Sequence, residues 1–186
     1  MDIDHSNYIF FCSHDMNKYK NNKYRAVFSQ WRHSTFTDDK GISYNSAEQY
    51  MMYQKSLLMD DLEIAKKILS IDIYDESCNS ESKVIFSSIA QIKKLGRKIK
   101  NFDQNKWNSN KLEIVKKGNY LKFSQNSDLK NILLQTDDKI LAEAASYDNI
   151  WGIGLSESQA LVTDPEYYGE NLLGKALMWT RSEIQK

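Results

Sequence analysis

The stretch from residue 45 to residue 62 constrains the fold most, because it reads as a helix that is apolar on nearly every side. One face carries methionine and leucine at helical spacing: Met51, Met52, Leu58, Met59 and Leu62. A second face carries Tyr50, Tyr53 and Leu57. Such a helix has little surface to give to solvent, so we expect it at the centre of a packed domain. Asn45, followed three residues later by Glu48, predicts a capping box at its start.

Glu48 and Lys55 are the two charged residues on this predicted helix that need an explanation. They are seven residues apart, which puts both side chains on one face, with Met51 and Met52 between them. The helix rise separates them by about 10 Å, too far for a direct ion pair. Burying an unpaired charge costs several kcal/mol. Either Glu48 bonds back to the cap and Lys55 extends its amine to solvent, or both line a polar cleft.

The rest of the chain predicts a mainly α fold with a few short N-terminal strands, in one compact domain over residues 1–186. Short strands are expected at 7–13 and 23–31, with a hairpin at 34–45 that turns through Asp38-Asp39-Lys40-Gly41. Residues 72–88 have no clear period and are interpreted as an insertion or loop. Helices are expected at 88–103, 108–126, 128–135, 137–146 and 169–185, and a glycine-bearing loop at 149–161.

Charge and cysteine content argue against several classes of protein. The formal net charge is zero, whereas a broad nucleic-acid footprint needs clustered Lys and Arg. Cys12 and Cys78 lie far apart and no histidine has metal-ligand spacing, so no metal site is expected. No P-loop or Rossmann fingerprint predicts a cofactor. No secretory leader and no apolar run of about 20 residues is seen, so we expect a cytoplasmic protein without a membrane partner.

Three short motifs are weaker candidates for ligand contacts. Residues 150–154, "IWGIG", either make a simple turn around a core tryptophan or bring amides and Trp151 to a ligand. The basic residues of "LGRK", including Arg97, either hold phosphate or complement a helix dipole. The helix start at "GENLLGKALM" either holds an anion or is capped by Asn171.

A series of motifs in the same order resembles the NADAR family, whose name abbreviates NAD- and ADP-ribose-associated and which includes the YbiA-like proteins. The motifs are "FSQW", "DDKGISYNSAEQYMMYQK", "KKLGRKIKNFD", "IVKKGNYLKFSQN", "LLQTDDKILAEAAS" with "DNIWGIGL", and "GENLLGKALMWTR". The resemblance covers about residues 28–181. The sequence departs from the family pattern in the longer stretch at 72–88 and in "QTDD", where the family usually has "TGD".

The resemblance implies a compact, mainly α-helical YbiA-like fold and hydrolysis of an N-glycosidic bond on a ribose derivative. One implied activity removes ADP-ribose from guanine bases, and another removes ribose phosphate from early riboflavin-pathway intermediates. A third possibility is an ADP-ribose-binding module without catalysis. By the family's motifs, Glu48 and Lys55 are the implied catalytic residues. The implied substrate-binding residues are Ser29, Trp31, Arg97, Trp151, Gly152, Gly154 and Asn171.

The implied partners are an ADP-ribose or phosphoribosyl substrate and, transiently, ADP-ribosylated nucleic acid. In such substrates the ribose C1′ is bonded to an exocyclic amine, which can open to an imine. A neutral Lys55 could exchange onto it as a Schiff base, and Glu48 could stabilise charge or move a proton. This expectation requires Glu48 and Lys55 to open onto one cavity with the 150–154 loop.

Overall fold

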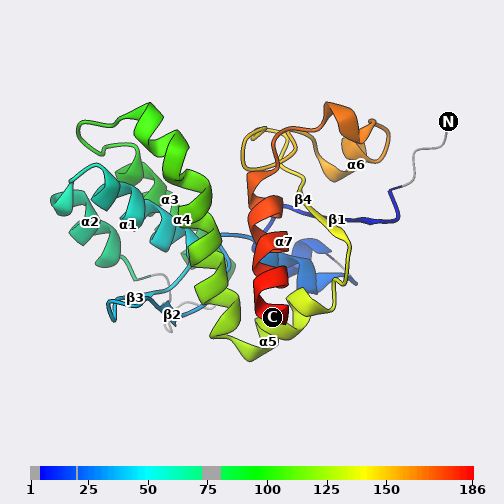
Figure 1. The fold of residues 1–186 in the computed structure, drawn as a ribbon, viewed down its shortest axis with the longest axis horizontal. Coiled ribbons are helices and arrows are strands. Elements are labelled where there is room, and N and C mark those ends of the chain that lie inside the picture. The colour runs from blue at the N-terminus through cyan, green and yellow to red at the C-terminus, as the bar shows by residue number, and fades with distance from the viewer. Residues whose placement is uncertain (1–4, 20, 73–80) are drawn as a thin grey trace. The chain divides into compact units, whose positions relative to one another are not determined.

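The computed structural model describes residues 5–19, 21–72 and 81–186, and its contacts divide into two compact units (Figure 1). The helical unit consists of residues 30–126. The terminal unit combines the described residues up to Ser29 with residues 127–186. The prediction that residues 1–186 form one domain stays a prediction.

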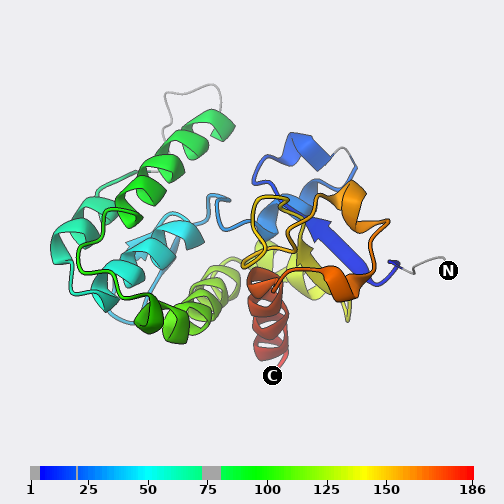
Figure 2. The same cartoon turned by 90° about the horizontal axis from the view of Figure 1, so that it is seen from above.

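The helical unit is built around the helix that the sequence places at its centre. Helix α1 (Ala47–Leu58) packs against α2 (Leu62–Leu69), α3 (Glu81–Gly96) and α4 (Gln104–Ser124), which Figure 2 shows around it. The tyrosines and methionines of the two predicted faces are buried, which confirms the central position of α1. Leu57 and Leu58 are only partly buried, and Leu62 begins α2 and is exposed, so the prediction is wrong for this last residue. Gly118 leaves room on α4 for the ring of Tyr50, because a Cβ there would collide with that ring.

The predicted hairpin is confirmed at β2 (Phe36–Thr37) and β3 (Ser43–Tyr44), which pair antiparallel. Asp38 organises the turn, since one carboxylate oxygen accepts the amides of Lys40 and Ile42 and the other accepts the Tyr44 hydroxyl at 2.8 Å. Gly41 supplies the positive φ of 76° that closes the turn.

Two helix boundaries differ from the prediction. Helix α3 begins at Glu81, so residues 81–88 are helical and not part of a loop, while residues 73–80 lie outside the described residues. Helix α4 begins at Gln104, four residues early, because Asp103 accepts the amides of Asn105 and Lys106 as its N-cap.

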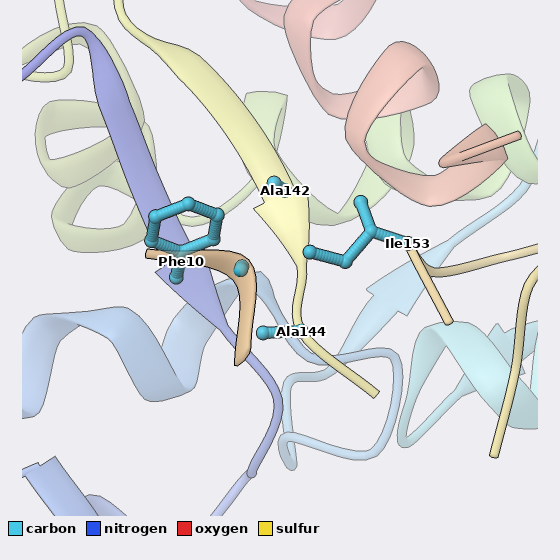
Figure 3. Close-up of a cluster of buried hydrophobic side chains, with 5 residues drawn as sticks. Phe10, Ala142, Ala144 and Ile153 are labelled. Carbon is cyan, nitrogen blue, oxygen red and sulfur yellow. The ribbon is translucent and has the colours of Figure 1, made fainter. Parts of the chain in front are cut away.

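The terminal unit contains a parallel strand pair, β1 (Tyr8–Phe11) with β4 (Ile140–Glu143). Helix α7 (Leu172–Gln185) packs against β4, and α5 (Ser127–Leu134) contacts α7. Figure 3 shows Phe10, Ala142, Ala144 and Ile153 gathered beside the two strands, where they form a buried apolar cluster with Ala160. The remaining elements are short: η1 (Met16–Tyr19), η2 (Lys23–Phe28), α6 (Glu157–Ala160) and η3 (Pro165–Tyr167).

Two predicted elements of the terminal unit are wrong. Residues 23–28 form the 3₁₀ helix η2, not a strand, and its consecutive Ala26, Val27 and Phe28 are all buried, without the alternation of a strand. The predicted helix at 137–146 contains strand β4 instead. Pairing with β1 outweighs the helix propensity of its alanines and glutamate. The mainly α class with few short strands is confirmed.

Gly174 is expected to be one of the least replaceable residues in the terminal unit. A Cβ at this position would overlap the backbone carbonyl oxygen of Leu141 and the side-chain amide of Asn171. Since backbone cannot move aside cheaply, Gly174→Ala should lower the unfolding free energy by about 2–3 kcal/mol in urea titrations. The exposed neighbour change Lys175→Ala should alter it by less than about 0.5 kcal/mol. Equal stability of the two variants would contradict this packing.

Candidate functional site

The start of α1 shows that capping is not the task of Glu48. Ser46 is the N-cap, and its hydroxyl accepts the amide of Gln49 at 3.1 Å. The Gln49 side chain in turn accepts the amide of Asn45 at 2.8 Å. The predicted Asn45–Glu48 capping box is therefore wrong by one residue, because Ser46 is the N-cap and Gln49 supplies the side chain that bonds back to the start of the helix. The capping box is therefore made without the Glu48 side chain.

Glu48 is buried in the helical unit. The residue is 3 % exposed, and Met51 and Met52 on the same helix are also buried. Its backbone amide donates to the carbonyl of Gln30 at 3.0 Å, which satisfies one of the free amides at the start of α1. A buried carboxyl group in such surroundings is a candidate acid or base.

Lys55 is held at the end of a neighbouring helix. Its Nζ donates to the backbone carbonyl of Gly96 at 3.2 Å, where α3 ends and carbonyl groups lack partners within the helix. The same Nζ lies 4.5 Å from the ring centre of Phe102 and 5.5 Å from that of Trp107. Two aromatic faces and a carbonyl oxygen therefore surround the amine.

The surroundings favour the neutral form of Lys55. Burial lowers the pKa of this amine from its usual range, the nearby Glu48 carboxylate opposes the shift, and the Arg97 charge adds to it. The net direction is downward. A lysine with a lowered pKa has more neutral amine at a given pH, which a nucleophilic role requires.

Arg97 and Trp31 also belong to the helical unit. Arg97 is exposed just past the end of α3 and lies near enough to Lys55 to act on its charge. Trp31 is half-buried, with the amine of Lys93 5.0 Å from its ring centre. An exposed guanidinium near the Lys55 amine fits the predicted role of Arg97 in holding phosphate.

The loop at 150–154 in the terminal unit is a tight turn whose amides are largely used by the protein. Asp148 accepts three of these amides. Its carboxylate oxygen accepts the amides of Ile150 and Trp151, and the backbone carbonyl of Asp148 accepts the amide of Gly154. A Cβ at Gly152 would meet the carbonyls of Glu143 and Asp148, and Gly154 has φ of 72°. Both glycines therefore shape the turn, and the half-buried Trp151 side chain is the part suited to a ligand.

Asn171 fastens α7 to β4. Its side-chain nitrogen donates to the carbonyl of Leu141 at 2.9 Å, and its oxygen accepts the amide of Glu143 at 3.1 Å. The amides of Leu172 and Leu173 at the helix start donate to loop carbonyls. These bonds occupy two of the amides that an anion at this helix start would use, and Asn171 at the N-cap position makes no side-chain cap bond, so the anion site at "GENLLGKALM" stays a prediction. Ser29, another predicted site residue of the terminal unit, directly follows η2 as its C-cap and is buried.

The nine predicted site residues are divided between the two units. The helical unit contains Glu48, Lys55, Trp31 and Arg97, and the terminal unit contains Ser29, Trp151, Gly152, Gly154 and Asn171. The prediction that both sets line one cavity stays a prediction. Sequence reasoning did not single out the aromatic neighbours of Lys55, Phe102 and Trp107, although Phe102 belongs to the motif "KKLGRKIKNFD".

Lys122 on α4 is a second unusual lysine that the sequence did not reveal. It is fully buried, with its amine 5.0 Å from the ring centre of Phe123. Burial, and then the charge of Arg32, lower its pKa to about 7.

The described part of the chain contains no group of three or more His, Cys, Asp or Glu side chains arranged to hold a metal ion. Within the same residues, no helix combines the length and hydropathy needed to cross a membrane.

Comparison with protein families places this geometry in context. The model of the NADAR domain matches residues 10–185. The chain belongs to the NADAR domain family. The matched range spans all of the helical unit and most of the terminal unit of this NADAR chain, and it includes Glu48, Lys55 and the 150–154 loop.

Two curated relatives of this NADAR chain have informative names. It is 41 % identical over 184 residues to "N-glycosidase R617" of Acanthamoeba polyphaga mimivirus, which covers 96 % of this chain and 97 % of that protein. It is 27 % identical over 146 residues to "Riboflavin biosynthesis protein VVA0006" of Vibrio vulnificus, which covers 78 % of this chain and 32 % of that protein.

Among solved structures, the chain resembles the NMR structure of the E. coli protein YbiA. The TM-score is 0.69 at 23 % identity, over 98 % of this chain and 88 % of that one. At this identity the likeness concerns the fold, and the predicted YbiA-like fold is confirmed.

Proposed function

We propose that this chain is an N-glycosidase that removes ADP-ribose from guanine bases, with Glu48 and Lys55 as its catalytic residues. The observation that carries the proposal is the setting of Lys55, a partly buried amine with a lowered pKa on the same helix as a buried carboxyl group. The likeness to a protein named N-glycosidase over nearly the whole chain supports the reaction class.

Lys55 acts in this proposal as a nucleophile on the ribose. The C1′–O4′ bond of the amine-linked ribose opens, O4′ takes a proton, and C1′ becomes an iminium. The neutral Lys55 amine leaves the carbonyl of Gly96 and adds to C1′, and the base amine departs with a proton. Water then adds to the Schiff base, the C1′–Nζ bond breaks, and the sugar closes again as a hemiacetal.

Glu48 supplies the proton movements in this proposal. A buried carboxyl group can give a proton to the departing amine and take one back from the water that attacks C1′. Its carboxylate form also favours the positive charge at C1′ and acts on the charge of Lys55. Ser46 and Gln49 make the cap bonds of α1, so the helix start does not depend on the Glu48 carboxyl group for its cap.

A second candidate substrate is a phosphoribosylamino intermediate of the riboflavin pathway. The likeness of this chain to a protein named for riboflavin biosynthesis favours this substrate. The ribose C1′ of the intermediate is also bonded to an exocyclic amine. The same two residues would serve both substrates. A third candidate, an ADP-ribose-binding module without catalysis, does not require an amine with a lowered pKa.

One assay separates the three candidates. The protein is incubated with a guanine-ADP-ribosylated oligonucleotide and, separately, with the ribosylamino-pyrimidine intermediate, and released sugar is measured. We expect release of ADP-ribose from the oligonucleotide. Release from the pyrimidine alone would establish the second candidate, and ADP-ribose binding without release from either substrate would establish the third.

A further inference from the structure

Asn119 on α4 is a fully buried polar residue to which neither the family motifs nor the proposed mechanism gives a task. Its side-chain nitrogen donates to the side-chain oxygen of Gln30 at 3.1 Å and to the carbonyl of Val115 at 2.9 Å. These two acceptors fix the orientation of the amide, because only the nitrogen can donate. The bond to Gln30 joins positions 89 residues apart.

Gln30 connects this buried amide to two predicted site residues of the helical unit. Its backbone carbonyl accepts the amide of Glu48 at 3.0 Å, and Trp31 follows it in the chain. Gln30 is itself 8 % exposed, so its side chain has little room to reorient. Hydrogen bonds therefore connect Asn119 through Gln30 to the backbone of Glu48 in the first turn of α1.

The side-chain oxygen of Asn119 is the second feature that bears on the role of this residue. The side-chain oxygen is buried and accepts no hydrogen bond from the described part of the chain. A buried acceptor without a donor costs free energy, which offsets part of what the two bonds donated by the nitrogen contribute to stability. The bond to Gln30 is the contact through which this amide acts on a distant part of the helical unit.

We propose that Asn119 is a positioning residue that fixes the Glu48 carboxyl group by holding Gln30. The inference rests on the proposed function in one respect, because the proposed function is what makes Glu48 a catalytic residue. Asn119 touches no reacting atom, and it keeps Gln30, and with it the start of α1, in one position. A small displacement of a catalytic group is enough to reduce turnover strongly.

Two variants break this chain of hydrogen bonds at different points. Asn119→Leu removes the donor and keeps the approximate volume, and Gln30→Met removes the acceptor and keeps the backbone carbonyl that binds the Glu48 amide. Asn110→Leu is the matched control, because Asn110 on the same helix makes the same bond to the carbonyl four residues earlier, at 2.8 Å to Lys106. It has no bond to Gln30 among the described contacts.

We expect Asn119→Leu and Gln30→Met each to lower kcat at least ~10-fold with KM little changed. The double variant should be no worse than either single variant, because both break the same connection. Asn119→Leu leaves the Gln30 side-chain oxygen without its donor, so its unfolding temperature should fall by a few degrees, and kcat is measured well below that temperature. Wild-type kcat in both single variants, or additive losses in the double variant, would overturn the proposal.

A second readout needs no substrate and therefore stands apart from the proposed function. The Lys55 amine is titrated by NMR, with its signal assigned by comparison with Lys55→Arg. Since Glu48 raises the pKa of Lys55, a displaced carboxylate should lower it, towards the value in Glu48→Gln. An unchanged Lys55 pKa in both Asn119→Leu and Gln30→Met would overturn the proposal. Absence of sugar release by the wild-type protein would instead overturn the proposed function.

Discussion

Glu48→Gln is expected to reduce turnover at least ~100-fold while leaving the fold intact. The amide has the size of the carboxyl group but can neither give nor take the proton that the reaction moves. Ser46 and Gln49 cap α1, so the change should alter the unfolding free energy by less than about 1 kcal/mol. Initial rates of sugar release and urea unfolding of the same preparation measure both quantities.

The matched control is Glu63→Gln on α2. Glu63 is an exposed glutamate whose carboxylate pairs with Lys67 at 2.7 Å and Lys100 at 3.1 Å, and these partners lower its pKa to about 2. Its replacement removes surface ion pairs, which contribute little to stability, and should leave turnover at the wild-type value. Wild-type turnover in Glu48→Gln, or a loss explained by unfolding, would remove Glu48 from the mechanism.

Lys55→Arg is expected to lower turnover at least ~1,000-fold, the largest effect among these changes. Arginine keeps the positive charge, the donor for the Gly96 carbonyl and the attraction to the rings of Phe102 and Trp107. It stays protonated at any ordinary pH, so it cannot form a Schiff base. Lys100→Arg, at an exposed lysine of the same unit, should leave turnover unchanged. Substantial turnover in Lys55→Arg would show that the amine acts only through its charge.

The pH dependence of turnover follows from the same residue. The neutral amine is the reactive form, so turnover should rise with pH through the pKa of Lys55. Burial and Arg97 place that pKa below its usual range although Glu48 opposes the shift, so the rise should be complete at lower pH than an ordinary lysine would allow. A rise centred at the usual lysine value would show that burial does not act on Lys55.

The sequence predicted the central helix correctly because its information is local. The apolar spacing from Tyr50 to Met59 specifies a buried helix, and the hairpin is specified by Asp38 and Gly41 within a few residues. The cap was misplaced by one residue because Asn45 and Ser46 are both good cap residues. The choice between them depends on Gln49, whose side chain is also held by the carbonyls of Ile68 and Ile71.

The errors concern contacts between distant residues. Residues 140–143 have helical propensity, and only their pairing with residues 8–11 makes them a strand. The hydrogen bond from the Lys55 amine to the Gly96 carbonyl joins residues 41 positions apart in the sequence, and no local spacing pattern predicts it. The spacing of Glu48 and Lys55 on an apolar helix singled them out, and the family resemblance implied a catalytic role for both. Only the structure shows that one is not a cap and that the other lies between two aromatic rings.

The most direct test of the account is reductive trapping during turnover. The wild-type protein is incubated with guanine-ADP-ribosylated oligonucleotide in the presence of borohydride, and the modified peptide is identified by mass spectrometry. The account predicts a reduced sugar adduct on Lys55, inactivation that parallels its formation, and no adduct on Lys55→Arg. Full turnover with no adduct, or an adduct on a different lysine such as Lys122, would contradict it.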